Sequence, residues 1–218
     1  MAAGEGGSQT LARGLRALAM IGEADRPMTV PALAAALDIH RSMAYRLVST
    51  LEQAGFVERT GAGTLAVGAR LAGIARNVAR DVQSVAVPEL LAAAVELDLT
   101  TFLVVHDGEA AVTLASAEPP HANAPVGQRP GTRHPVDRGA PGRAIRSQLD
   151  PDSFPPARYE ISHDEVVEGV TAIAVPLAMP GRPAASVAAL YPSSRKVDVD
   201  LVADRLAATA DRIDRAVR

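Results

Sequence analysis

Residues 38–57 read DIHRSMAYRLVSTLEQAGFV, and their apolar and polar side chains separate with a helical period. At about 100° per residue the apolar side chains share one arc, which predicts a core-facing helix from about residue 41 to residue 54. These apolar residues are Met43, Ala44, Leu47, Val48, Leu51 and Ala54. The opposite side carries Arg41, Ser42, Tyr45, Arg46 and Ser49. Its acid, Glu52, comes only in the last turns, before the terminating Gly55.

This distribution of charge favours contact with DNA. A recognition helix enters the major groove with its N-terminal half, where cations and hydrogen-bonding side chains are needed. Arginine pairs with guanine edges or with phosphate, whereas serine and tyrosine suit phosphate and base-edge contacts. The alternative interpretation is an ordinary solvated helix face, and the neighbouring elements decide between the two.

The segment before this helix predicts two more helices. Residues 11–23 have a helical period, and DRP at 25–27 ends it. Thr29 is a good N-cap for a short helix over residues 30–37, and its N–H groups offer a phosphate site. His40 lies in the entry turn of the helix that begins at residue 41. We include Thr29 and His40 among the candidate DNA contacts.

The segment after this helix predicts a hairpin. Two short strand-like runs, 56–59 and 64–67, flank the glycine turn TGAG. Arg59 lies beside this turn and is a further candidate DNA contact. Helix, helix, turn, helix and hairpin is the order of a winged helix-turn-helix. We therefore assign residues 1–67 to a DNA-binding domain.

Composition limits the class of protein. Apolar residues make up 48% of the 218 residues and aromatic residues 3%, so the core must be aliphatic. The absence of cysteine excludes disulfides, thiolate zinc sites and a cysteine nucleophile, and it fits a reducing cytoplasm. No apolar run approaches membrane-spanning length, so we expect a cytoplasmic protein without membrane contact.

The charge balance places a condition on DNA binding. The net charge is −3, and residues 1–67 contain six Arg and six Asp or Glu. A neutral domain has no excess of positive charge with which to bind phosphate, so its affinity for DNA must depend on a few well-placed cations. Arg41 and Arg46 are the cations on the polar face of the predicted helix.

The rest of the chain predicts a linker and a second domain. Residues 68–82 have a helical period and are assigned to a linker helix, and residues 83–218 to an α+β domain with a central antiparallel sheet. Asp107-Gly108 is a hairpin turn, and the helix of this region is expected to begin only after Pro88. The predicted elements are helices 89–98, 140–149 and 198–217 and strands 100–106, 110–116, 169–179 and 184–191.

Several segments carry a resemblance to a known family. PMT, LAAALDI, SMAYRL, LEQAGFV and LAVG follow in the order of the N-terminal domain of the IclR (isocitrate lyase regulator type) family of bacterial transcription factors. VVHDGEAAVTLASAE, GTRHPVDRGAPGRAI and ISHDEVVEGVTAIAVPL resemble segments of the family's second domain. The resemblance therefore covers most of the chain.

The resemblance implies a regulator, a repressor in our interpretation, that binds palindromic operator DNA as a homodimer or tetramer. It implies a GAF-like C-terminal domain that binds an organic acid or a similar small-molecule effector. The effector contacts carried over from it are Asp137, Gly139, Ala140, Pro141, His163, Asp164, Ala172 and Ala188.

The chain departs from the family pattern at the implied pocket. The usual G-K-A reads G-R-A with Arg143, and Asp137 stands where histidine is common. Ala172 replaces a frequent cysteine, and Ala188 and Leu190 replace frequent serines. A pocket that loses these groups has less hydrogen-bonding capacity for a carboxylate. Two interpretations stay open: an effector more apolar than the family norm, or an occluded pocket in a domain that serves mainly in oligomerisation.

Other chemistries find little support. No two of the five histidines, His40, His106, His121, His134 and His163, have the i, i+3 or i+4 spacing of a helical metal site. A metabolite-processing enzyme is the rival hypothesis, but no nucleophile-base, phosphate-loop or zinc-protease motif occurs. We take the stretch SHDE at 162–165 as a solvated loop near the pocket. We therefore expect no enzymatic activity, no metal and no cofactor.

Overall fold

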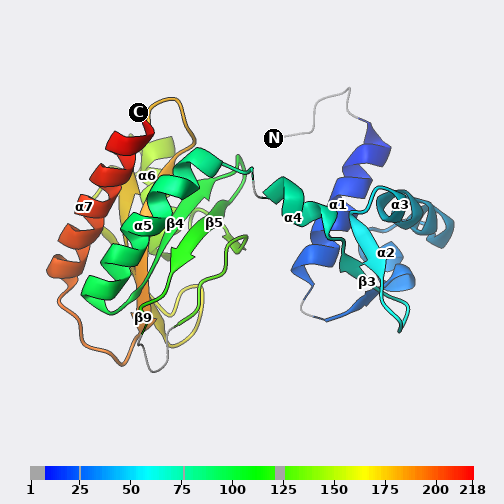
Figure 1. Cartoon of the computed structure of the whole chain (residues 1–218), viewed down its shortest axis with the longest axis horizontal. Helices are drawn as coiled ribbons and strands as arrows, with labels where there is room; N and C mark the ends of the chain where they lie inside the picture. The colour runs from blue at the N-terminus through cyan, green and yellow to red at the C-terminus, as the bar shows by residue number, and fades with distance from the viewer. Residues whose placement is uncertain (1–7, 25, 76, 121–125) are drawn as a thin grey trace. The chain divides into compact units, whose positions relative to one another are not determined.

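The computed structural model describes residues 8–24, 26–75, 77–120 and 126–218. The chain divides into two compact units, Met1–Val78 and Ala79–Arg218 (Figure 1). His121 lies outside the described residues. Within them no helix is long and apolar enough to cross a membrane. The same residues contain no group of three or more His, Cys, Asp or Glu side chains suited to a metal ion.

The N-terminal unit is a winged helix-turn-helix, as predicted. Its short strands form an antiparallel sheet in the order β1-β3-β2. The elements are α1 (Gln9–Glu23), β1 (Met28–Thr29), α2 (Val30–Ala36), α3 (Arg41–Gln53), β2 (Val57–Arg59), β3 (Thr64–Val67) and α4 (Arg70–Ala75).

The apolar stripe of α3 fastens this helix to the domain. Ala44 and Val48 are fully buried in a cluster that also contains Ala17 of α1 and Leu33 of α2. Burying a leucine or valine side chain contributes roughly 1.5–3 kcal/mol, so the stripe fixes which face of α3 is left outside. Met43 was predicted to face the core but is 38% exposed. It lies at the edge of the stripe, where the Arg13 guanidinium donates to its sulfur.

The C-terminal unit is built on a six-stranded sheet in the order β6-β5-β4-β9-β8-β7, with every neighbouring pair antiparallel. This confirms the predicted α+β class with a central antiparallel sheet. The elements are α5 (Arg80–Leu97), β4 (Thr100–His106), β5 (Ala111–Ala117), β6 (Arg133–His134), α6 (Gly139–Leu149), β7 (Glu160–His163), β8 (Val170–Leu177), β9 (Ala185–Pro192) and α7 (Val199–Val217).

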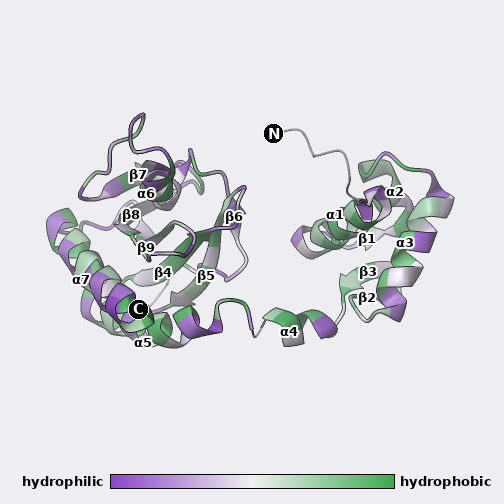
Figure 2. Ribbon diagram, turned by 90° about the horizontal axis from the view of Figure 1, so that it is seen from above, coloured by the Kyte–Doolittle hydropathy of each residue, from purple (hydrophilic) through white to green (hydrophobic). Residues whose placement is uncertain are grey.

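Helices cover both faces of this sheet. In Figures 1 and 2, α5 and α7 lie side by side on one face, and α6 lies on the other. The alternation of side chains along each strand supplies both cores. On β4, for example, Leu103 belongs to the cluster under α5 and α7, whereas Phe102 belongs to the cluster under α6. The smaller core under α6 contains the candidate pocket.

The linker differs from the prediction. We expected one helix over 68–82 and a new helix after Pro88, but α4 ends at Ala75 and α5 begins at Arg80. Ala79 has φ 43°, a left-handed conformation that an α-helix does not contain.

Pro88 lies inside α5 on its exposed side. The bond that its missing N–H would have made to the carbonyl of Ser84 is lost on a face where Ser84 is also exposed, so water can replace it.

A second difference concerns the stretch SHDE, which we took as a loop. Ser162 and His163 belong to β7, which pairs with β8 at the edge of the sheet. The interpretation as a solvated loop is wrong for these two residues and holds for the exposed Asp164, whereas Glu165 lies in the loop but is only partly exposed. The short strand has a single fully apolar residue, Ile161, so its sequence pattern is weak, and pairing with β8 determines its conformation.

Candidate functional site

The first turn of α3 has an unusual cap. His40 occupies the N-cap position, and its Nδ1 atom accepts a hydrogen bond from the Ser42 N–H at 3.3 Å. The same ring atom lies 2.8 Å from the Ser42 hydroxyl oxygen. A cap satisfies an N–H group that has no partner within the helix. His40 therefore orders the start of the helix, and it ties down the Ser42 side chain that we predicted as a DNA contact.

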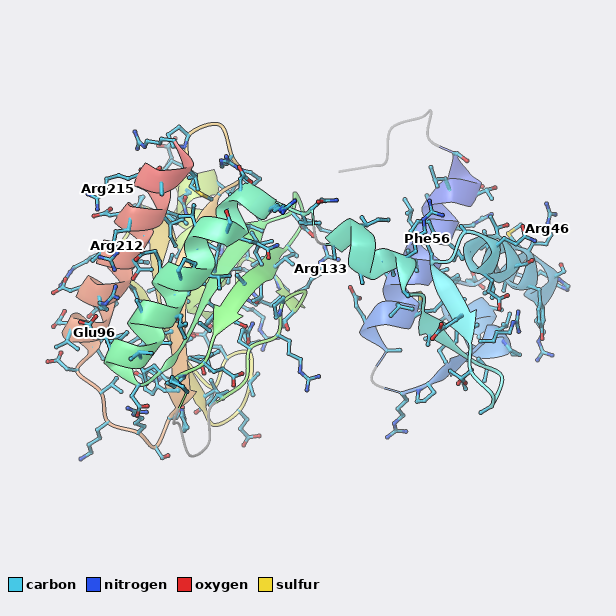
Figure 3. All side chains as sticks on the ribbon, in the orientation of Figure 1. Arg46, Phe56, Glu96, Arg133, Arg212 and Arg215 are labelled. Atoms are coloured by element: carbon cyan, nitrogen blue, oxygen red, sulfur yellow. The ribbon has the colours of Figure 1, made fainter. Side chains whose placement is uncertain are left out.

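The outward face of α3 carries cations without partners. Arg41, Ser42, Tyr45, Arg46 and Ser49 are all exposed. Among the residues that the structure describes, Arg41 and Arg46 form no ion pair or hydrogen bond through their side chains. Figure 3 shows Arg46 projecting outward from α3. Two unpaired guanidinium groups on the first two turns of an exposed helix form a surface for an anionic partner.

Arg59 is held differently from these two arginines. Its Nε atom donates to Glu52 of α3 at 2.9 Å, and its guanidinium lies 5.8 Å from the centroid of the Tyr45 ring. The hairpin strand is thereby joined to the polar face of α3. Since Glu52 neutralises Arg59, the cationic character of this face rests on Arg41 and Arg46. Thr29 is also exposed, and its hydroxyl caps α2 by accepting from the Ala32 N–H at 3.3 Å.

The C-terminal unit holds a cavity of about 90 Å³ between the α6 face of the sheet and the loop after β7. Its apolar walls come from the sheet, from α6 and from the loop, and its polar walls from the chain around β6 and from β7. The lining residues are Phe102, Gln128, Thr132, His134, Gly139, Pro141, Ser162, Glu165, Val166, Val167, Val170, Ala172 and Leu190.

Three of the predicted effector contacts line this cavity: Gly139, Pro141 and Ala172. Ala140 and Ala188 are fully buried in the same core but do not line it. Asp137 is exposed and does not line it either.

His163 and Asp164 belong to a different network. His163 Nδ1 lies 2.9 Å from the Thr171 hydroxyl, which lies 2.9 Å from the Ser193 hydroxyl. Asp164 accepts from the Gly169 N–H at 2.8 Å and from Ser193 at 3.2 Å. Because adjacent strand residues face opposite sides, Ser162 lines the cavity and His163 does not.

Sequence reasoning missed Glu165, the one carboxylate among the described residues of the lining. Its carboxylate accepts from the Gly139 N–H at 3.0 Å and from Arg143 Nη1 at 2.6 Å. Burial alone would raise the pKa of this carboxyl group. The hydrogen bonds from Arg143 and Gly139, with the charges of Arg143 and Arg138, outweigh burial and hold the pKa below its ordinary value. The stretch SHDE contained the available signal, an acid directly after the predicted contact Asp164.

Arg143, which stands in G-R-A, is fully engaged inside the protein. Its Nε atom donates to Glu160 at 2.9 Å, and its other nitrogens donate to Glu165 and to the Ile161 carbonyl. Burial alone would lower the pKa of this guanidinium, but the two carboxylates raise it above the ordinary arginine value. Arg143 joins α6 to β7 and to the loop that follows it.

The fold and the first site define a class of protein. The chain combines a winged helix-turn-helix, whose third helix is exposed and cationic, with an α+β domain that holds a small cavity. This is the organisation of a DNA-binding transcriptional regulator.

Comparison with known proteins identifies the N-terminal domain and the overall fold. Residues 10–61 match the family model of the IclR helix-turn-helix domain. An IclR transcriptional regulator from Alicyclobacillus acidocaldarius has the same fold, with a TM-score of 0.82 at 21% identity, over 97% of this chain and 100% of that chain. Residues 10–61 therefore form a helix-turn-helix domain of the IclR type, and the chain as a whole has the fold of a solved IclR regulator.

Other solved structures have the same fold. An IclR homologue from Microbacterium hydrocarbonoxydans, complexed with 4-hydroxybenzoate, gives a TM-score of 0.77 at 21% identity, over 96% of this chain and 99% of that chain. Thermotoga maritima IclR gives 0.67 at 20% identity, over 95% and 98%. No curated protein matches the chain.

Proposed function

We propose that this protein is a cytoplasmic transcriptional repressor that binds a palindromic operator as a homo-oligomer and releases it when a small molecule occupies the C-terminal cavity. The observation that supports DNA binding most directly is the outward face of α3, where Arg41 and Arg46 are exposed and have no side-chain partner in the part of the chain that the structure describes. In this proposal both arginines contact guanine edges or phosphate, and Ser42, Tyr45 and Ser49 add polar contacts.

Around this helix, Thr29 and His40 lie at the starts of α2 and α3, where helix N-termini bind phosphate. Arg59 holds the hairpin against α3 and brings the turn at residues 60–63 toward the DNA backbone. The proposed units are residues 1–67 for DNA binding, 68–82 as a linker and 83–218 for the effector.

The proposed effector site is the cavity under α6, with Gly139, Pro141 and Ala172 in its wall. One structural relative is complexed with 4-hydroxybenzoate, which supports a small organic molecule as the effector. Occupancy of the cavity would change the geometry between subunits and hence the spacing of two recognition helices, which is a coupling between sites.

A second candidate role for the C-terminal unit is oligomerisation around a closed pocket. The cavity of about 90 Å³ favours it, since pockets that enclose ligands usually measure about 300–1,000 Å³.

Genome-wide mapping of bound DNA in the host, with a reporter fused to the strongest bound promoter, tests the main proposal. We expect enrichment of a two-fold symmetric sequence and a rise in reporter expression when the gene is deleted. Binding without symmetry would contradict the palindromic operator, and a fall in expression would contradict repression. Light scattering of the purified protein measures the oligomeric state independently.

A further inference from the structure

The N-terminus of α6 has no donor left for an anionic ligand. The first four N–H groups of an α-helix lack partners within the helix, and for that reason they commonly bind carboxylates or phosphates. Here the Arg138 N–H donates to the Pro135 carbonyl at 3.3 Å, and the Gly139 N–H donates to Glu165. The Ala140 N–H donates to the Ser162 hydroxyl at 3.0 Å, and Pro141 has no N–H.

The arginines beside the cavity also form hydrogen bonds within the protein. Arg143 donates to two carboxylates and to a backbone carbonyl, and Arg138 donates to the backbone carbonyl of Glu165. Among the described residues that line the cavity there is no lysine or arginine. An incoming carboxylate would therefore meet the negative charge of Glu165 without a free cation to offset it. Two like charges at about 4 Å repel strongly even at an effective dielectric constant near 20.

The rest of the lining suits a neutral molecule. Besides Glu165, its polar side chains are Gln128, Thr132, His134 and Ser162, and Phe102, Val170 and Leu190 belong to its apolar wall. The Nδ1 atom of His134 lies 3.2 Å from the Pro135 carbonyl, which can only accept, so Nδ1 carries the proton. In the neutral ring Nε2 is then an acceptor. One N–H of the Gln128 amide donates to Thr113, which leaves its other N–H to donate and its carbonyl oxygen to accept.

We propose that the effector is a small neutral molecule with an apolar body and a hydrogen-bond donor, and that Glu165 occupies the place of the carboxylate that the family resemblance implied. This inference rests on the proposed function of the cavity and specifies its ligand class. An amide or alcohol fits, because its N–H or O–H donates to acceptors in the wall. The matching acid is disfavoured by Glu165.

The loop that carries Glu165 also sets the size of the ligand. Residues 164–169, which we call the lid, begin at Asp164 with φ 56° and end at Gly169 with φ 76°. Val166 and Val167 line the cavity and are nevertheless 48% and 56% exposed. A cavity that accepts benzene measures about 150 Å³, larger than the 90 Å³ here. A short branched amide has as many non-hydrogen atoms as benzene, so it is a suitable probe only if the exposed side chains of Val166 and Val167 shift to admit it.

The test compares isobutyramide with isobutyrate, which have the same shape and differ in charge, by titration of ¹⁵N-labelled full-length protein. Wild type is compared with Glu165→Gln and with Glu160→Gln. Glu160→Gln is the matched control, because Glu160 also pairs with Arg143 but does not line the cavity. We expect the wild type to bind the amide at least about tenfold more tightly than the acid. Glu165→Gln should reduce that preference several-fold, and Glu160→Gln should retain it.

Three outcomes would overturn the inference. The wild type could prefer isobutyrate or bind 4-hydroxybenzoate more tightly than 4-hydroxybenzamide. The two variants could change the preference equally, which would indicate a general effect of Arg143. All probes could fail to bind the wild type and both variants, which would favour the closed pocket. Operator binding by the same samples reports separately on the proposed function, since it depends on α3.

Discussion

Two helix N-termini in this protein are used in opposite ways. At α3 the first two turns present Arg41 and Arg46 to the outside without partners in the described residues. At α6 every N–H of the first turn has a partner within the protein or is absent, and Arg143 is surrounded by carboxylates. Both sites combine a helix N-terminus with arginine, the usual composition of an anion-binding site.

The difference teaches that residue types do not define an anion site. The N-terminal domain is neutral overall, and at α3 it places cations on an exposed face without carboxylate partners in the described residues. An external polyanion can therefore form ion pairs with them. At α6 the chain supplies its own carboxylate from a loop. Sequence patterns treat the two sites alike, and only the neighbours in space distinguish an open site from a closed one.

The largest expected effect is on the closed site. Gly139 has φ 74°, and a Cβ atom there would lie 2.9 Å from Val166 Cγ2. Gly139→Ala should lower the free energy of unfolding of the C-terminal unit by about 2–4 kcal/mol, from backbone strain and displacement of the lid. Gly181→Ala is the control, since Gly181 has φ 76° with open space around it. Urea unfolding measures both, and equal losses would show that contact with the lid contributes nothing.

The next effect is on the open site. Arg46→Ala should weaken operator binding by about 2 kcal/mol, or roughly 30-fold, because it removes one of the two unpaired cations of α3. Fluorescence anisotropy at several salt concentrations measures it. If Arg46 contacts a phosphate, the slope of log affinity against log salt should fall by about one. Arg16→Ala, an exposed arginine of α1, should leave affinity unchanged. Equal losses from the two variants would place DNA on a different face.

A smaller effect is expected at the cap of α3. His40→Ala removes the acceptor for the Ser42 N–H and should destabilise the N-terminal unit by about 1 kcal/mol. His40→Asn should restore most of that loss, because asparagine is a good N-cap. Thermal unfolding followed by circular dichroism reports both. If His40→Ala loses stability and His40→Asn does not regain it, the imidazole acts by packing and not as a hydrogen-bond acceptor.

The smallest effect is the pH dependence of the lid. The pKa of Glu165 is lowered in the folded protein, so its ionised form contributes stability that is complete above the ordinary glutamate pKa. That contribution is lost as pH falls through the lowered value. The carboxylate is 35% exposed, so the effect should stay below about 1 kcal/mol. Urea titrations of wild type and Glu165→Gln between neutral and acid pH should converge at the acid end, and a constant difference would exclude ionisation as the cause.

Much of the fold could be predicted from local patterns. The apolar spacing of 41–54 gave α3 to within one residue at its end, and Thr29 was recognised as the cap of α2. The predictions of secondary structure and burial failed where packing against another element or exposure to solvent determined the conformation. Pro88 remains inside α5 because its side of the helix faces outward, and β7 forms because β8 offers an edge. Met43 is exposed because it lies at the margin of the stripe.

The candidate sites divide in the same way. Exposure of Arg41 and Arg46 follows from their position opposite a strong apolar stripe, so their availability could be anticipated from the sequence. The positions of His163 and Glu165 could not be anticipated, because strand pairing turns one of them away from the cavity and the lid brings the other into it.

The sequence by itself determined the class of each domain and the composition of the polar face of α3, because helical and strand periods depend on neighbours a few residues apart. Only the tertiary structure decided that the N–H groups of Gly139 and Ala140 are occupied. Their partners lie 26 and 22 residues further along the chain, and the contact depends on how β7 and the lid pack against α6. Such contacts involve residues distant in sequence, so no local period records them.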